Sequence, residues 1–296
     1  MSERENVNNA RTDAVDPSQT PVVILCGGKG TRLGDVSRLR PKPLVAIGGM
    51  PILWHIMKFY SHHGYRRFVL CLGYKGEMIE EFFTKGTVGG EPASRGDPAE
   101  PDWRITFADT GPETGTSGRV HRIEPHVKDA PRFFLTYGDG VANVSLDALL
   151  AHHEKAGRIG TVTAVRPETS FGIIREENGI AMAFAEKPRL EVIINGGFFV
   201  FERSFFRYVE SDGALEQKPL VTLTADGQLA VHRHEGFWQC MDDQKQMETL
   251  NAMWDRGERP WAVWEGHALG RAQPGRAVEK MRRKESEAAE ASPKRT

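Results

Sequence analysis

The stretch Ile24-Leu25-Cys26-Gly27-Gly28-Lys29-Gly30-Thr31-Arg32, followed closely by Pro41-Lys42-Pro43, decides the fold. Apolar residues 22–25 predict a buried strand, and the glycine-dense loop after it lets backbone N–H groups approach a polyphosphate. Arg32 and Lys42 add positive charge beside that loop. The stretch therefore predicts a nucleoside triphosphate site at the end of a strand.

Two common glycine loops do not fit this stretch. A Walker loop needs Ser or Thr after its Gly-Lys, whereas Lys29 is followed by Gly30. The dinucleotide fingerprint needs a glycine at position 33, which is Leu33, so an NAD-dependent dehydrogenase is excluded. A plain glycine turn after a buried strand is the remaining alternative. The spaced basic residues after the loop argue for a binding role instead.

Composition and charge exclude several classes of partner. Lys and Arg total 39 against 40 Asp and Glu, a net charge of −1, so no overall field would attract nucleic acid or an anionic membrane. Three scattered cysteines are too few for a disulfide framework or a zinc site. No apolar run approaches the roughly 20 residues of a membrane span. We expect a cytoplasmic protein that binds neither nucleic acid nor membrane.

One α/β domain is expected over residues 21–268, between two polar extensions. Residues 1–20 lack the apolar stretch of a signal peptide and predict a disordered leader. Residues 269–296 are rich in Arg, Lys, Glu and Ala and predict a charged, disordered tail. Residues 86–101 are dominated by Gly, Pro, Glu and Asp and predict a flexible excursion or lid.

Within the domain, expected strands alternate with expected helices, which predicts a Rossmann-like, mostly parallel wound sheet. Ligands bind beyond the carboxyl ends of the strands in such sheets. The expected strands are 22–25, 68–72, 105–108, 133–137, 160–165, 173–175, 180–185, 193–201 and 229–234, and the expected helices are 52–60, 78–83, 146–156, 217–224 and 244–256. The strands after Phe171 are expected to extend the sheet or to form a small β-rich ribbon that closes one end of the cleft.

A carboxylate follows one of these strands, in Tyr137-Gly138-Asp139-Gly140-Val141. Its flanking glycines would let phosphate and metal come close. Mg²⁺ keeps several waters and takes one or two protein carboxylates together with substrate phosphates. Asp242 is the candidate for the second acid. Taken alone, Asp139 could equally be a turn residue that stabilises its own loop.

The glycine loop with Pro41-Lys42-Pro43 resembles the signature of the sugar-1-phosphate nucleotidyltransferases. Four longer motifs are similar to the glucose-1-phosphate cytidylyltransferase branch in particular, and they lie at residues 47–57, 137–141, 194–200 and 236–242. The resemblance runs from about Val22 to Glu265. It implies the nucleotide-diphospho-sugar transferase fold, a homo-oligomer, and a Mg²⁺-dependent reaction of CTP with α-D-glucose 1-phosphate that releases pyrophosphate.

The resemblance also implies roles for individual residues. Nucleotide-binding residues would be Leu25, Gly27, Gly28, Gly30, Thr31, Arg32, Arg119 and Gly138; catalytic residues Arg32, Lys42 and Lys187; sugar-phosphate-binding residues Gly172, Glu186, Lys187 and Asn195; and metal ligands Asp139 and Asp242. Arg32 would draw charge from the leaving pyrophosphate, and Lys42 would steady the reacting phosphates. No general base is required, because a sugar phosphate is ionised at neutral pH.

Two departures from the family pattern leave alternatives open. Residues 189–193 are shorter than their counterpart and lack its glycines, so the acceptor could be another sugar, a cyclitol phosphate or a phosphonate. Asp243 is an additional acid, which we expect to cap the following helix. A nucleotide-sugar-dependent glycosyltransferase is disfavoured, because its usual Asp-x-Asp is Asp139-Gly140-Val141 here. A non-catalytic nucleotide sensor is disfavoured by the intact charged residues.

Overall fold

The computed structural model describes residues 16–92, 99–169 and 171–266. Most of the expected leader and the whole expected tail lie outside these ranges. Residues 16–20, which we had assigned to the leader, are ordered: Pro17–Gln19 forms a 3₁₀ turn whose cap is the side chain of Asp16. Arg67 donates a hydrogen bond to the carbonyl of Gln19 at 3.3 Å. The folded part therefore includes a turn just before the first strand.

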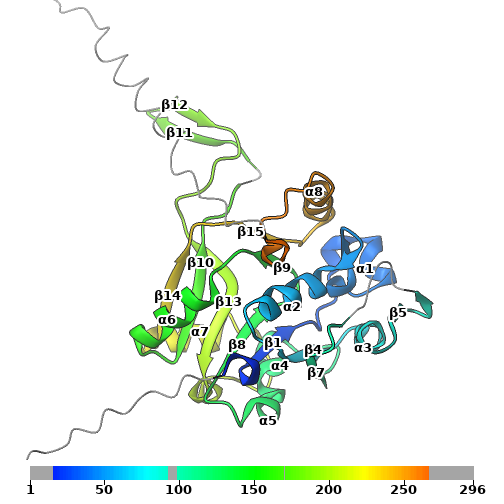
Figure 1. Ribbon diagram of the computed structural model, residues 1–296. Coiled ribbons are helices and arrows are strands. Elements are labelled where there is room, and N and C mark those ends of the chain that lie inside the picture. Colours follow the sequence, from blue (N-terminus) through cyan, green and yellow to red (C-terminus); the bar gives the residue numbers. More distant parts are fainter. Residues whose placement is uncertain (1–15, 93–98, 170, 267–296) are drawn as a thin grey trace, which may run out of the picture.

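Seven strands form the central sheet, in the order β14-β10-β13-β8-β1-β4-β7 (Figure 1). Their bounds are β1 Pro21–Leu25, β4 Arg67–Leu72, β7 Arg104–Asp109, β8 Arg132–Tyr137, β10 Gly160–Val165, β13 Ile194–Glu202 and β14 Leu229–His234. Strands β8, β1, β4 and β7 are parallel, β14 pairs parallel with β10, and β13 is antiparallel to both its neighbours. The expected mostly parallel wound sheet is confirmed.

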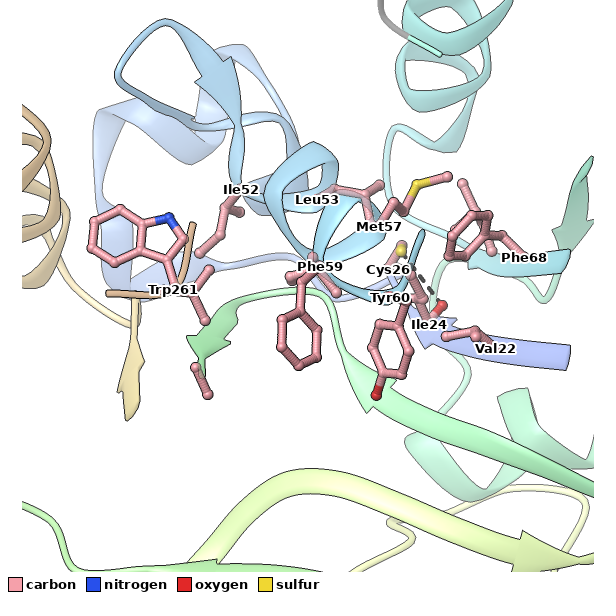
Figure 2. Close-up of a cluster of buried hydrophobic side chains, with 14 of the residues drawn as sticks. Val22, Ile24, Cys26, Ile52, Leu53, Met57, Phe59, Tyr60, Phe68 and Trp261 are labelled. Carbon is pink, nitrogen blue, oxygen red and sulfur yellow. Dashed lines mark hydrogen bonds between the residues drawn. The ribbon is translucent and has the colours of Figure 1, made fainter. Parts of the chain in front are cut away.

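Helices cover both faces of the sheet. One face is covered by α2 (Ile52–His62), α3 (Gly76–Lys85) and α6 (Leu146–Ala156), and the other by α4 (Thr116–Arg122), α5 (Glu124–Val127) and α7 (Lys218–Ala225); α8 (Gln244–Asp255) joins the first core but packs beside the short strand at Ala46–Ile47. Successive side chains of β1 enter opposite cores, Val22 and Ile24 the first and Val23 and Leu25 the second. Figure 2 shows the first core beneath α2. This burial on both faces is why the strand is uniformly apolar.

Several short elements lie around the sheet. They are α1 (Asp35–Leu39) and the strands β2 (Ala46–Ile47), β3 (Met50–Pro51), β5 (Thr87–Val88), β6 (Glu91–Pro92), β9 (Gly140–Ala142) and β15 (Trp238–Cys240). β5 and β6 pair as a hairpin within the segment that we expected to be flexible. The carboxylate of Glu81 holds its turn by accepting hydrogen bonds from Thr87 Oγ1 at 2.6 Å and from the N–H of Gly90 at 2.9 Å. Residues 87–92 therefore form regular structure that the sequence pattern did not predict, and the structure does not describe residues 93–98.

Strands β11 (Ile173–Glu177) and β12 (Ile180–Ala185) form a two-stranded ribbon that projects from the body (Figure 1). Every residue in both strands is exposed, including Ile180 and Phe184 at 66% each. We expected the strands after Phe171 either to extend the sheet or to form a small ribbon. β13 and β14 extend the sheet, and β11 and β12 form the ribbon. The ribbon does not line the cavity described below, so in this structure it does not close the cleft.

A buried histidine lies on α2 among tryptophan rings. His55 is fully buried, with ring centroids 5.3 Å from Trp54 and 5.1 Å from Trp254. Its Nε2 donates to the carbonyl of Ile47 at 2.9 Å, and Nδ1 has no hydrogen-bond partner among the described residues. Burial lowers the pKa of His55 to about 4, although the bond to Ile47 works in the opposite direction. The ring is therefore neutral at pH 7.

We expect the neutral His55 to make folding sensitive to acid. Its pKa is about 4 in the folded protein against 6.5 in the unfolded chain, so the unfolded chain takes up the proton first as pH falls. The free energy of unfolding should decline by about 3 kcal/mol between pH 7 and pH 4 through this group alone. Chemical denaturation across that range, compared with His55→Gln, measures the contribution. If the free energy of unfolding fell equally steeply with pH in both proteins, the depressed pKa of His55 would be contradicted.

Candidate functional site

A cavity of about 250 Å³ lies at the carboxyl ends of β1 and β8. It is lined by residues from the glycine loop, from the Pro-Lys-Pro segment, from the loop after β8 and from the segment after β15. These residues are Leu25, Cys26, Gly28, Gly30, Thr31, Arg32, Lys42, Pro43, Gly138, Asp139 and Asp242. Most of the residues expected to bind nucleotide or metal therefore meet in one place, as strand-end loops in a parallel sheet should.

Two glycines of the loop are required by close packing against cations. A Cβ on Gly27 would lie 1.9 Å from Nη1 of Arg119, so any side chain there would have to displace the buried guanidinium. Gly30 has φ +61°, in the left-handed region, and its Cβ would lie 2.9 Å from the Cβ of Lys42. The glycines thus let the loop lie directly on Arg119 and Lys42.

Arg119 lies behind the loop and does not line the cavity. Its side chain comes from α4 and is 4% exposed. The guanidinium donates to the carbonyl of Gly27 at 3.0 Å, to the carbonyl of Leu72 at 3.0 Å and to Thr110 Oγ1 at 2.7 Å. Its burial contradicts the surface-charge alternative, and the nucleotide contact implied by the resemblance stays a prediction. Arg119 ties the first loop to the ends of β4 and β7.

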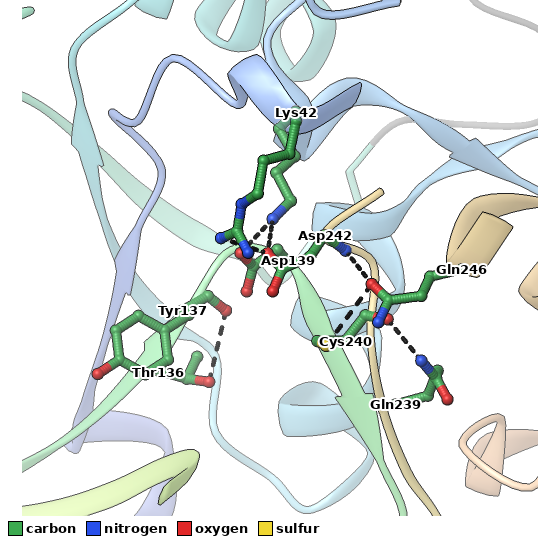
Figure 3. A network of polar contacts seen from close by, with 9 residues as sticks. Lys42, Thr136, Tyr137, Asp139, Gln239, Cys240, Asp242 and Gln246 are labelled. Carbon is green, nitrogen blue, oxygen red and sulfur yellow. Dashed lines mark hydrogen bonds and ion pairs between the residues drawn. The ribbon is translucent and has the colours of Figure 1, made fainter. Parts of the chain in front are cut away.

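The two acids are brought together by a small antiparallel sheet. β9 begins at Gly140, next to Asp139, and β15 ends at Cys240, two residues before Asp242; Gly140 and Cys240 are paired. The N–H of Met241 donates to the carbonyl of Asp139 at 2.8 Å. Figure 3 shows both carboxylates on the same side of this pairing. Residues a hundred positions apart therefore present their carboxylates to one point.

Lys42 lies at that point (Figure 3). Its Nζ is 2.6 Å from Oδ2 of Asp139 and 2.6 Å from Oδ1 of Asp242, and Nη2 of Arg32 is 3.1 Å from the same Asp242 oxygen. Burial disfavours the charged form of both Lys42 and Asp242. The ion pairs outweigh it, raising the pKa of Lys42 and lowering the pKa of Asp242. Both shifts favour the charged forms, so Lys42 and Asp242 are held as an ion pair.

The donor set at this point fits a magnesium ion. Two carboxylate oxygens already converge on one cationic nitrogen, so Asp139 and Asp242 can contact a single cation. Among the described residues no group of three or more His, Cys, Asp or Glu side chains is placed to hold a metal. Two carboxylates suit Mg²⁺, which takes its other ligands from water and substrate phosphates.

The expected sugar-phosphate residues lie apart from the cavity. Gly172, Glu186 and Lys187 are at the base of the ribbon, where a Cβ on Gly172 would lie 3.1 Å from Oε2 of Glu186. Glu186 and Lys187 form an exposed ion pair at 3.4 Å. Asn195, the second residue of β13, donates through Nδ2 to the hydroxyl of Tyr137 at 3.2 Å. Of this group, only Asn195 reaches the edge of the sheet where the cavity lies.

The start of α8 contains a positioning group that the sequence analysis missed. Asp243 caps the helix by accepting from the N–H of Gln246 at 2.8 Å, so the expected cap is confirmed. Oε1 of Gln246 accepts from the N–H of Asp242 at 2.5 Å. The Asp243-x-x-Gln246 spacing, close to a capping box, was a sequence signal for this contact. Together the two residues fix the backbone of Asp242.

Comparisons with known proteins agree with this arrangement. The model of the family described as "Nucleotidyl transferase" matches residues 21–254. A Bacillus subtilis (strain 168) protein named "Probable glucose-1-phosphate cytidylyltransferase" is 45% identical over 254 residues, covering 82% of this chain and 99% of that protein. The "Glucose-1-phosphate cytidylyltransferase" of Salmonella typhi is 41% identical over 255 residues, with the same coverage of 82% and 99%.

A solved structure shares the fold. The crystal structure of HddC from Yersinia pseudotuberculosis superposes with a TM-score of 0.58 at 21% identity, covering 79% of this chain and 99% of that one. None of the helices in the described ranges is both long and apolar enough to cross a membrane.

Proposed function

Because this chain belongs to the nucleotidyl transferase family, on its glucose-1-phosphate cytidylyltransferase branch, we propose that it joins CTP to a sugar 1-phosphate and releases pyrophosphate. The default acceptor is α-D-glucose 1-phosphate. The observation that carries the proposal is the convergence of Lys42, Arg32, Asp139 and Asp242 beside the glycine loop. Such a group of charges suits two polyphosphate substrates that must be brought together.

In the proposed reaction a phosphate oxygen of the sugar 1-phosphate attacks the α-phosphorus of CTP. A bond forms between that oxygen and the α-phosphorus, while the bond from the α-phosphorus to the oxygen bridging to the β-phosphate breaks, and pyrophosphate leaves with the electron pair. Lys42 and Arg32 offset the repulsion between the two anions, and the loop backbone orients the triphosphate. Mg²⁺, held by Asp139 and Asp242, would supply further charge neutralisation at the phosphates.

The acceptor end of the proposed site includes Lys187. This residue has φ +47°, in the left-handed region, and it precedes Pro188, which disfavours helical backbone. Backbone strain of this kind often accompanies function. We infer that Lys187 binds the sugar phosphate, with Glu186, Gly172 and Asn195 contacting the sugar.

Replacing Lys187 by Ala should raise the Michaelis constant for the sugar phosphate by at least about tenfold and leave that for CTP within twofold, because the residue lies away from the nucleotide loop. Initial-rate kinetics with each substrate varied in turn provide the measurement. Arg175→Ala, on the same ribbon, is the matched control. Equal effects on both substrates would move Lys187 out of the acceptor site.

We also infer a cytoplasmic homo-oligomer. The three cysteines are free thiols, which agrees with a reducing compartment. The exposed apolar side chains of the ribbon, such as Ile180 and Phe184 at 66% each, support burial against another copy. Light scattering on the purified protein tests the oligomer, and a monomer at micromolar concentration would contradict it.

Pyrophosphate release tests the proposed function directly. The assay contains Mg²⁺ and pairs CTP, UTP, dTTP, ATP and GTP with glucose 1-phosphate and with other sugar, cyclitol and phosphonate acceptors. Turnover with CTP and glucose 1-phosphate is the expected result. CTP turnover with a different acceptor would assign a new specificity to residues 189–193, and no release from any pair would overturn the proposal.

A further inference from the structure

The charged groups that line the cavity balance one another. They are two cations, Arg32 and Lys42, and two acids, Asp139 and Asp242. Lys42 contacts both acids at 2.6 Å and is only 10% exposed in its side chain, whereas Arg32 contacts Asp242 alone and is 72% exposed. A free divalent cation approaching the two carboxylates would therefore meet no net negative charge, and it would meet a buried ammonium between them.

The backbone of Lys42 cannot withdraw to make room. Lys42 begins the 3₁₀ turn Lys42–Leu44 and is flanked by Pro41 and Pro43, which fix the local backbone. The Cβ of Lys42 also packs directly against Gly30: a Cβ added to Gly30 would lie 2.9 Å from it. The ammonium therefore moves by rotation of the side chain. The open space into which it can move is the cavity beside the glycine loop.

We propose that Lys42 is an internal counter-ion that keeps the affinity of the two carboxylates for a free divalent cation low until a polyphosphate takes over its ammonium. This inference rests on the proposed function, because the polyphosphate is the nucleotide of that reaction. When phosphate oxygens bind Lys42, Asp139 and Asp242 lose the ammonium that they share and become available to the metal. Metal and nucleotide then strengthen each other's binding, and by linkage the effect is equal in both directions.

Binding of Mn²⁺ alone to the full chain, followed by electron paramagnetic resonance without nucleotide, tests this role. Wild type should bind weakly, and Lys42→Met should bind at least roughly tenfold more tightly because both carboxylates lose their ammonium. Lys29→Met is the matched control: Lys29 lies on the same loop but pairs with Glu113 at 2.7 Å, so its loss should leave Mn²⁺ affinity unchanged. The double variant that combines Asp139→Asn with Lys42→Met should lose the gain in Mn²⁺ affinity.

Two further comparisons keep the outcome decisive. If Lys42→Met folds poorly, Lys42→Gln replaces it, and Mn²⁺ should raise its melting temperature by more than that of wild type. Unchanged Mn²⁺ affinity in a folded Lys42 variant, or tight Mn²⁺ binding by the wild type without nucleotide, would overturn the counter-ion role whatever the enzyme's activity. If the Mn²⁺ results hold but CTP yields no pyrophosphate, the proposed function fails while the counter-ion role stands.

Discussion

Asp139→Ala should lower kcat by about three orders of magnitude, and Asp242→Ala should do the same. The two carboxylates present oxygens to one point, 2.6 Å from the ammonium of Lys42. Each replacement would leave that cation with a single acid and would remove one of the two ligands proposed for Mg²⁺. Catalysis of phosphoryl-type transfer consists largely of such charge neutralisation and positioning, so little activity should survive. Pyrophosphate release at saturating CTP and sugar phosphate measures kcat.

Asp243→Ala is the matched control for this prediction. Asp243 is adjacent in sequence to Asp242, but its carboxylate caps α8 by accepting from the N–H of Gln246. Loss of a helix cap costs about 1 kcal/mol of stability, so the melting temperature should fall while kcat stays within about tenfold. A loss of less than tenfold in Asp139→Ala would refute the metal-ligand assignment. An equal loss in all three variants would indicate damage to the fold of β9 and β15.

The strands and helices with strong periodic patterns were predictable from sequence, and α4 was not. Strand β1 is uniformly apolar because both of its faces are buried, and α2 repeats its apolar residues at helical spacing, so each pattern was sufficient. Helix α4 is only Thr116–Arg122 and contains Gly118, so it carries little pattern. Its role depends on what Arg119 contacts, and two of those partners, Gly27 and Leu72, are distant in sequence.

Part of the candidate site could likewise be predicted from the sequence and part could not. The meeting of the glycine loop with Asp139 could be predicted because strand-end loops of a parallel sheet converge, whereas Lys42 and Asp242 were found through their motifs and the resemblance. The position of the ribbon could not be predicted, because it depends on contacts between distant segments at its base. There Arg189 donates to the carbonyls of Arg166 at 3.2 Å and Glu235 at 3.3 Å. Arg189 opens the segment that departs from the family pattern, so local sequence was least informative where the acceptor is proposed to bind.

Arg119→Met should destabilise the protein by about 4 kcal/mol. Arg119 is 4% exposed, and its guanidinium satisfies the carbonyls of Gly27 and Leu72 together with the hydroxyl of Thr110. Methionine fills similar space but donates no hydrogen bond, so three hydrogen bonds from a charged donor would be lost, while the carbonyls of Gly27 and Leu72 keep the N–H groups of Tyr74 and Thr110 as donors. The loop at Gly27 would also loosen, and CTP affinity should fall with stability. Chemical denaturation and calorimetric titration with CTP provide the two measurements.

Arg122→Met, on the same helix, separates this role from a general effect of lost charge. Arg122 is exposed and donates to Thr114 Oγ1 at 2.7 Å and to the carbonyl of Thr110, but it does not contact the glycine loop, so its replacement should cost about 1 kcal/mol and leave CTP affinity unchanged. The decisive comparison is between stability and affinity in Arg119→Met. A large loss of CTP affinity with unchanged stability would make Arg119 a direct nucleotide ligand, as the family resemblance implied. A parallel loss of both would establish that Arg119 acts on the nucleotide only through the loop that it holds.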